Sequence, residues 1–257
     1  MRLSQRFAIS VLLALLLAAL APPLAAAQTR PRRVSTSPDT APVMKLLAGR
    51  PAAETFRALA TFRIPAFSEA DRAEVMRSMP ARFTTAVVDD TDASVATLKQ
   101  RLKPLLSLHG RDGALAVILY RDPAPEVLSF PGAFIAISTG MIDLAGSDGA
   151  LFGVAARELA REYFVLPSAY ARYDGDESLA EEQALNCDAV TVASLLALKQ
   201  SPAEYKALLT RLYRMASADT SPGEHAALEA AFTSRMAAIN RLEVILKRPN
   251  KGGAPVS

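Results

Sequence analysis

The amino-acid sequence predicts an α+β fold, a mostly helical single domain with a small central sheet. Helix signals recur along most of the 257-residue chain, as N-cap residues and as apolar residues spaced three or four positions apart. Only two short apolar runs, 114–120 and 133–138, are bounded by turn residues in the way that strands are. The chain has no internal repeat, and its length suits one sizeable core.

The helices are predicted from their apolar spacing and from the residues at their ends. Ser68 is a candidate N-cap, followed by acidic residues in the first turn, for a helix that Pro80 ends. Ser201 and Pro202 are a candidate N-cap and first helical residue. Apolar spacing predicts further helices over 43–62, 92–108, 149–165, 179–198 and 203–215, and a last helix from Pro222 to 246.

The N-terminal residues have the pattern of a secretory signal peptide. Arg2 and Arg6 precede an apolar run at 7–20, and small residues at 25–27 form an A-x-A cleavage site. We therefore expect residues 1–27 to be removed. The apolar run is shorter than the ~20 residues that a spanning helix needs. The mature protein is predicted to be soluble and periplasmic or secreted, with no transmembrane segment.

The remaining chain divides into a folded domain and two polar ends. Residues 28–42 are rich in Pro, Ser, Thr and Arg and are predicted to form a flexible linker, and residues 247–257 a flexible basic tail. The domain is predicted over 43–246. The formal net charge of +3 belongs to the signal peptide and the ends, because acidic residues outnumber basic ones between 34 and 246. A nucleic-acid-binding face is therefore not expected.

Histidine and cysteine are too scarce for common metal motifs. The chain has two histidines, His109 and His225, far apart in sequence, and one cysteine, Cys187. A single cysteine excludes a disulfide within the chain and any zinc site built from several cysteines. The two distant histidines exclude a short His-x-His or His-x₃-His pair. We expect Cys187 to be a small buried hydrophobic residue.

The segment 126–162 resembles the HtpX and CAAX-prenyl-protease family of zinc metallopeptidases (metallopeptidase family forty-eight). The resemblance rests on the expected strand 133–138, the Thr139-Gly140 turn and the helix expected from 149. Pro131-Gly132 corresponds to the family's Pro-Gly-Gly, with Ala133 in place of the second glycine. It is strongest over 126–190 and extends loosely over 88–245. It implies a zincin-like metallopeptidase scaffold, which in the family binds zinc and cleaves peptide bonds.

The motif that carries catalysis in this family is degenerate here. The His-Glu-x-x-His positions are Arg157, Glu158 and Arg161, and the third ligand position, four residues before Asp188, is Ala184. Arginine stays protonated and has no free lone pair, so these positions cannot ligate zinc. Glu158 matches the family's general base. The resemblance therefore implies a scaffold without zinc or any other cofactor, and we do not expect an enzyme.

If the family fold is present, Arg157 and Arg161 point toward the former metal position. We expect arginine–carboxylate pairs to replace zinc as the link between the two motif helices. Glu158, Asp188 and Glu182 are the candidate carboxylates.

The resemblance also implies a binding function. In the family, substrate chains lie extended against an edge strand beside the motif helix, and a peptide can add to such an edge without being cut. We place this edge at Ala133, Phe134, Ile135, Ala136, Ile137 and Ser138. The expected protein is a regulatory pseudopeptidase of the cell envelope. Its expected partner is a peptide, an unfolded protein segment or an envelope protease.

Two alternatives stay open from the sequence. One is an active metalloendopeptidase with a non-standard metal site, and the other is an unrelated helical envelope protein. Oxygen ligands for such a metal could come from Asp174, Asp176, Glu177, Glu181 and Glu182.

Overall fold

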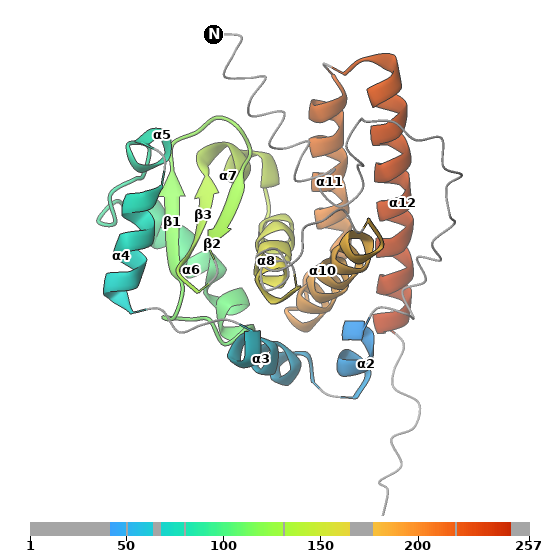
Figure 1. Cartoon of the computed structure of the whole chain (residues 1–257), viewed down its shortest axis with the longest axis horizontal. Helices are drawn as coiled ribbons and strands as arrows, with labels where there is room; N and C mark the ends of the chain where they lie inside the picture. The colour runs from blue at the N-terminus through green and yellow to red at the C-terminus, as the bar shows by residue number, and fades with distance from the viewer. Residues whose placement is uncertain are drawn as a thin grey trace, which may run out of the picture.

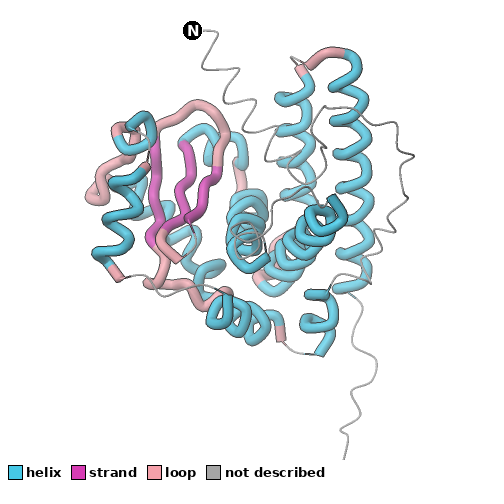
Figure 2. Tube along the Cα trace, in the orientation of Figure 1, coloured by secondary structure: helices cyan, strands magenta, loops and turns pink. Residues whose placement is uncertain are grey.

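The computed structural model describes residues 42–49, 51–63, 68–79, 81–130, 132–164, 177–218 and 220–247. The predicted signal peptide, nearly all of the predicted linker and residues 248–257 lie outside these ranges. In chain order the elements are α2 (Pro42–Gly49), α3 (Ala52–Arg63), α4 (Glu69–Ser78), α5 (Ala81–Thr84), α6 (Ala93–Leu108), β1 (Ala116–Tyr120), β2 (Val127–Phe130), β3 (Phe134–Ser138), α7 (Thr139–Ala145), α8 (Asp148–Phe164), α10 (Glu177–Ala197), α11 (Pro202–Ser217) and α12 (Pro222–Lys247). The predicted α+β class is confirmed, because helices surround a small sheet (Figures 1 and 2).

Helices α4, α6 and α11 begin at or next to the predicted residues, because side chains satisfy their first backbone N–H groups. Ser68 caps α4 in a capping box, accepting from the Asp71 amide while Asp71 accepts from Ser68. Asp92 caps α6 through the Ser94 amide at 2.8 Å. Ser201 caps α11, whose first residue is proline. These local signals fix the helix starts independently of the core.

The sheet is three-stranded and mixed, with the strand order β1-β3-β2. β3 pairs parallel with β1 and antiparallel with β2. β1 and β3 correspond to the two predicted strands. β2 was not predicted, because its four residues, Val-Leu-Ser-Phe, form a short run without a clear alternation of apolar and polar residues.

Helices cover both faces of the sheet. Alternate residues of β3 point to opposite sides: Ile135 and Ile137 belong to the main core, and Phe134 and Ala136 to a smaller one. The main core includes α6 and α8, and the smaller core includes residues of α4 and α5. Figure 1 shows α8 between the sheet and α10, with α11 and α12 side by side beyond it.

α8 is the central helix of the fold. It packs against α10, α11 and β2, and almost all of its side chains are buried. The segment that carries the degenerate motif therefore lies in the interior, between the sheet and the C-terminal helices. Among the residues that the structure describes, no helix combines the length and the hydropathy that crossing a membrane requires.

Candidate functional site

Arg157 of α8 and Asp188 of α10 form an ion pair between the two motif helices. Arg157 Nε lies 3.6 Å from Asp188 Oδ1, and both side chains are largely buried. The sequence predicted that an arginine and a carboxylate would link these helices, and Arg157 and Asp188 do so. That this link replaces a zinc ion stays a prediction. This N–O distance exceeds that of a normal hydrogen bond, so the two side chains attract each other by charge without forming a hydrogen bond.

Asp188 is held more tightly by Arg235 of α12. Arg235 Nε donates to Asp188 Oδ2 at 3.1 Å and Nη2 donates to Oδ1 at 2.8 Å. The Nη2 group also donates to the hydroxyl of the fully buried Tyr205 at 2.8 Å. This two-point contact is the strongest geometry available to a guanidinium and a carboxylate. Asp188 therefore connects α8, α10 and α12.

The pKa values of this cluster reflect burial and neighbouring charge. Burial alone would lower the pKa of Arg235, but the charge of Asp188 and its hydrogen bonds outweigh burial and raise it. Burial raises the pKa of Tyr205 to about 12. Both groups thus keep their protons at physiological pH. Sequence reasoning placed Arg235 only within a loosely matching segment and missed its role, because nothing local marks its contact with Asp188.

Arg161 and Glu158 pair within α8. Arg161 Nη1 donates to both carboxylate oxygens of Glu158 at 3.1 Å, across one helical turn. The hydroxyl of Ser129 on β2 lies 3.3 Å from Glu158 Oε2, so it ties the same carboxylate to the sheet. The pairing described for Arg161 therefore stabilises α8 and its contact with β2, and does not reach Glu182, which is exposed on α10.

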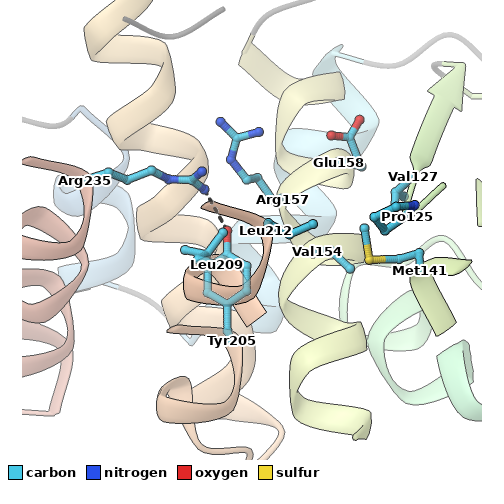
Figure 3. Close-up of a pocket in the computed structure, with 10 residues that line it drawn as sticks. All are labelled: Pro125, Val127, Met141, Val154, Arg157, Glu158, Tyr205, Leu209, Leu212 and Arg235. Carbon is cyan, nitrogen blue, oxygen red and sulfur yellow. Dashed lines mark hydrogen bonds between the residues drawn. The ribbon is translucent and has the colours of Figure 1, made fainter. Parts of the chain in front are cut away.

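A small pocket lies where α8, α11, α12 and the segment leading into β2 meet (Figure 3). Its volume is about 60 Å³. Four polar side chains line it: Arg157, Glu158, Tyr205 and Arg235. The rest of the wall is apolar, formed by Pro125, Val127, Met141, Val154, Leu209 and Leu212. The pocket thus combines arginines with an apolar wall.

The donor set at the expected ligand positions does not fit a zinc ion. Arg157 and Arg161 present N–H donors without a free lone pair, and the methyl group of Ala184 has no ligand atom. Among the described residues, no three His, Cys, Asp or Glu side chains gather as a possible metal site. Of the alternative oxygen ligands, Asp174, Asp176 and the side chains of Glu177 and Glu181 lie outside the described residues.

His109 has a structural role. Its Nε2 lies 3.0 Å from Ser194 Oγ, and Ser194 itself donates to the Val190 carbonyl. Ser194 can therefore only accept from His109, which places the imidazole proton on Nε2 and leaves Nδ1 to accept from Tyr163 at 2.8 Å. Burial, followed by the charge of Arg111, lowers the pKa of His109 to about 3. The neutral ring thus joins α6, α8 and α10.

Cys187 is buried on α10, as expected, and burial raises the pKa of its thiol to about 12. The thiol form is therefore favoured, and the group is not a nucleophile.

A second buried contact between an arginine and a glutamate involves Glu162, the residue of α8 that directly follows Arg161. Glu162 Oε2 is 3.6 Å from Arg111 Nη2, and both side chains are almost fully buried. Burial raises the pKa of Glu162 to about 8, although Arg111 and the nearby Gly132 amide oppose this shift. Neither carboxylate oxygen makes a hydrogen bond of normal geometry within the described chain. No pattern in the sequence indicates this contact.

The structure corrects the position of the binding edge. β3, predicted as the edge strand, is the central strand and is buried at every residue from Phe134 to Ser138. Its backbone is paired on both sides, so no further strand can add there. The outer side of β1 is partly covered, because Val87 and Tyr120 form an antiparallel bridge. β2 is the edge that lies beside α8.

The hydrogen-bond pattern of β2 shows which groups face outward. Ser138 N–H donates to the Glu126 carbonyl, so Glu126 and Ser138 are a hydrogen-bonded pair. Because such pairs alternate along antiparallel strands, Val127 and Ser129 direct their N–H and C=O groups away from β3. Within the described chain these groups have no backbone partner. Val127 also lines the pocket, so the free edge and the pocket adjoin.

No protein-family model matches this chain, and no curated protein matches it significantly. The resemblance to zinc metallopeptidases therefore stays a prediction from residues 126–190. The geometry defines an arginine-containing pocket on α8, with the unpaired edge of β2 at its rim.

Proposed function

We propose that this protein is a non-catalytic relative of the zinc metallopeptidases, exported to the periplasm or secreted, that binds extended peptide or unfolded protein segments. One observation carries the proposal: the side chain at the first expected ligand position, Arg157, forms an ion pair with Asp188 of α10. An arginine–carboxylate contact thus lies where the resemblance would place a metal.

Two further features support a zincin-like scaffold. α8 packs along α10, and the antiparallel strand β2 runs beside α8. Ser129 of that strand contacts Glu158, which occupies the general-base position. The export step rests on the signal-peptide pattern of residues 1–27.

Binding would occur by strand addition to β2. The outward N–H and C=O groups of Val127 and Ser129 can pair with an extended chain, and main-chain pairing of this kind tolerates many sequences. An unfolded segment, or an extended loop of an envelope protease, would pair equally well with the outward backbone groups of β2. The function would be that of a scaffold or regulator, because the bound chain meets arginines rather than a metal.

The catalytic half of the proposal is tested with casein, an unfolded protein substrate. We expect casein to bind and to remain intact over hours, with and without a chelator, and the purified protein to contain no stoichiometric zinc. Stoichiometric zinc together with chelator-sensitive cleavage would establish an active metallopeptidase and overturn the proposal.

The binding half is tested at Ser129. Ser129→Pro removes the outward N–H group, and proline is tolerated at a position of this kind on an edge strand. We expect this variant to lose most of its affinity for casein. Ser129→Ala removes only the hydroxyl and is the matched control, for which we expect near wild-type affinity. Equal binding by both variants would exclude strand addition at β2.

A further inference from the structure

We infer that Arg157 is a carboxylate-recognition group, which holds the free C-terminal carboxylate or an acidic side chain of a peptide bound along β2. This inference rests on the proposed function, since it states which chemical group of the bound peptide the pocket recognises. It goes beyond the proposed function, because it assigns a ligand to the positive charge of Arg157.

The first argument is the balance of charge in the pocket. Asp188 engages Arg235 through both of its oxygens, at 2.8 and 3.1 Å. Glu158 accepts from Arg161 through both of its oxygens. Arg157 has only the 3.6 Å contact with an aspartate that is already paired. Within the described chain, the pocket therefore has one more positive than negative charge.

The second argument is the lack of hydrogen bonds to Arg157. Its side chain is only 11% exposed, and its buried Nε has no hydrogen-bond partner among the described residues. Buried donors without partners are costly, whereas a bidentate bond to a carboxylate is strong and directional. Figure 3 shows the guanidinium of Arg157 between Arg235 and Glu158 in the pocket, with no dashed line to it. A carboxylate ligand would satisfy both the charge and the donors.

The third argument is the apolar wall. Val127, Met141 and Leu209 line the same pocket as Arg157. Its volume of about 60 Å³ suits a carboxylate with a short apolar group, and is far smaller than the ~300 Å³ typical of sites for larger ligands. Because Val127 belongs to both the pocket and the β2 edge, a peptide paired with β2 can place its carboxylate on Arg157.

The test uses the wild-type protein and unlabelled peptides in isothermal titration calorimetry. Three versions of one Ala/Ser/Thr peptide ending in valine are compared: a free acid, a C-terminal amide, and an amide with one internal glutamate. We expect the free acid, the glutamate peptide or both to bind about tenfold or more tightly than the neutral amide. Preference for the free acid identifies a chain end as the source of the carboxylate. Preference for the glutamate peptide identifies a side chain.

Variants then assign the preference to one residue. Arg157→Gln should reduce the affinity for the preferred acid to that for the amide, and Arg157→Lys should retain part of it because the charge remains. Arg77→Gln is the matched control, since Arg77 is exposed on α4 and pairs only with Glu74 in the described chain. It should bind like the wild type.

The outcomes separate this inference from the proposed function. If the wild type binds the three peptides equally, or if Arg157→Gln keeps the preference, the inference is wrong and strand addition can still hold. If neither the peptides nor casein bind, both are wrong. The comparison of acid with amide needs no variant, so it stays decisive even if Arg157→Gln does not fold.

Discussion

Gly153 of α8 lies directly against the ring of Tyr205 of α11, and a Cβ atom at Gly153 would overlap the ring carbons. This close approach lets Tyr205 lie against α8, while its hydroxyl accepts a hydrogen bond from Arg235. The glycine is needed for space rather than for an unusual backbone angle. Helix packing at this point therefore supports the charged cluster on Asp188.

Gly153→Ala should destabilise the protein despite the higher helix propensity of alanine. We expect the free energy of unfolding to fall by about 1–3 kcal/mol, the usual cost of overpacking. Gly223→Ala is the control, because nothing lies within 4 Å of a Cβ at Gly223. It should be neutral or slightly stabilising. Urea denaturation measures both, and equal effects would show that Tyr205 can move away at little cost.

The two arginines on Asp188 should differ in their contribution to stability. Arg235→Gln leaves a buried aspartate without its two-point partner, and we expect a loss of roughly 3 kcal/mol, since Arg157 can only partly take its place. Arg157→Gln removes a cation that makes no hydrogen bond in the described chain, so its effect should stay below about 1 kcal/mol. Urea denaturation of the two variants gives the comparison, and a larger loss for Arg157→Gln would contradict the geometry.

Glu162 should make stability fall as the pH rises. Its pKa of about 8 in the folded protein exceeds the ordinary value of 4.5, so folding takes up a proton between these two pH values. Its contribution is fully present below pH 4.5 and is lost as the pH approaches 8. The slope for one such group is at most about 1.4 kcal/mol per pH unit.

The window for this measurement is pH 6.5 to 8. Below 6.5, the lowered pKa of His109 gives the opposite slope, because the unfolded chain binds a proton that the buried imidazole does not. Between 6.5 and 8 the effect of Glu162 should therefore dominate. Glu162→Gln should flatten the dependence of the free energy of unfolding on pH in this window. A wild-type curve as flat as that of the variant would show that Glu162 is ionised throughout.

Lys199→Gly should stabilise the end of α10. Lys199 has a φ of 57°, and the Gln200 and Lys199 amides bond back to the Leu195 and Leu196 carbonyls. Gly110 has the equivalent position after α6, with a φ of 66°. Glycine adopts this conformation without strain, so we expect a gain of about 0.5–1 kcal/mol. Thermal unfolding measures it, and Lys199→Ala, which keeps the strain, should show no gain.

The sequence predicted the local structure better than the long-range contacts. Ser68, Asp92 and Ser201 mark helix starts because capping is decided within a few residues. The strand order could not be predicted, because β2 is short and its pairing with β3 depends on contacts outside the strand itself. The predicted binding edge was therefore placed on the wrong strand.

Within the candidate site, only the contact between residues at the expected ligand-motif positions could be predicted from the sequence. The pairing of Arg157 with Asp188 follows from the motif positions. The contacts of Arg235 with Asp188, and of Arg111 with Glu162, join residues 47 and about 50 positions apart in the chain, and no spacing rule indicates them. Buried ion pairs of this kind arise from tertiary packing alone.

The hydrogen bonds of His109 make one imidazole a reporter of the fold. The ring joins three helices in a single tautomer, and stacks on Phe56 of α3 with ring centroids 4.4 Å apart. Only one other histidine, His225, exists in the chain. The two nitrogen resonances of His109 can therefore be assigned by a single substitution of His225. They would reveal directly whether α6, α8 and α10 remain docked when a peptide binds.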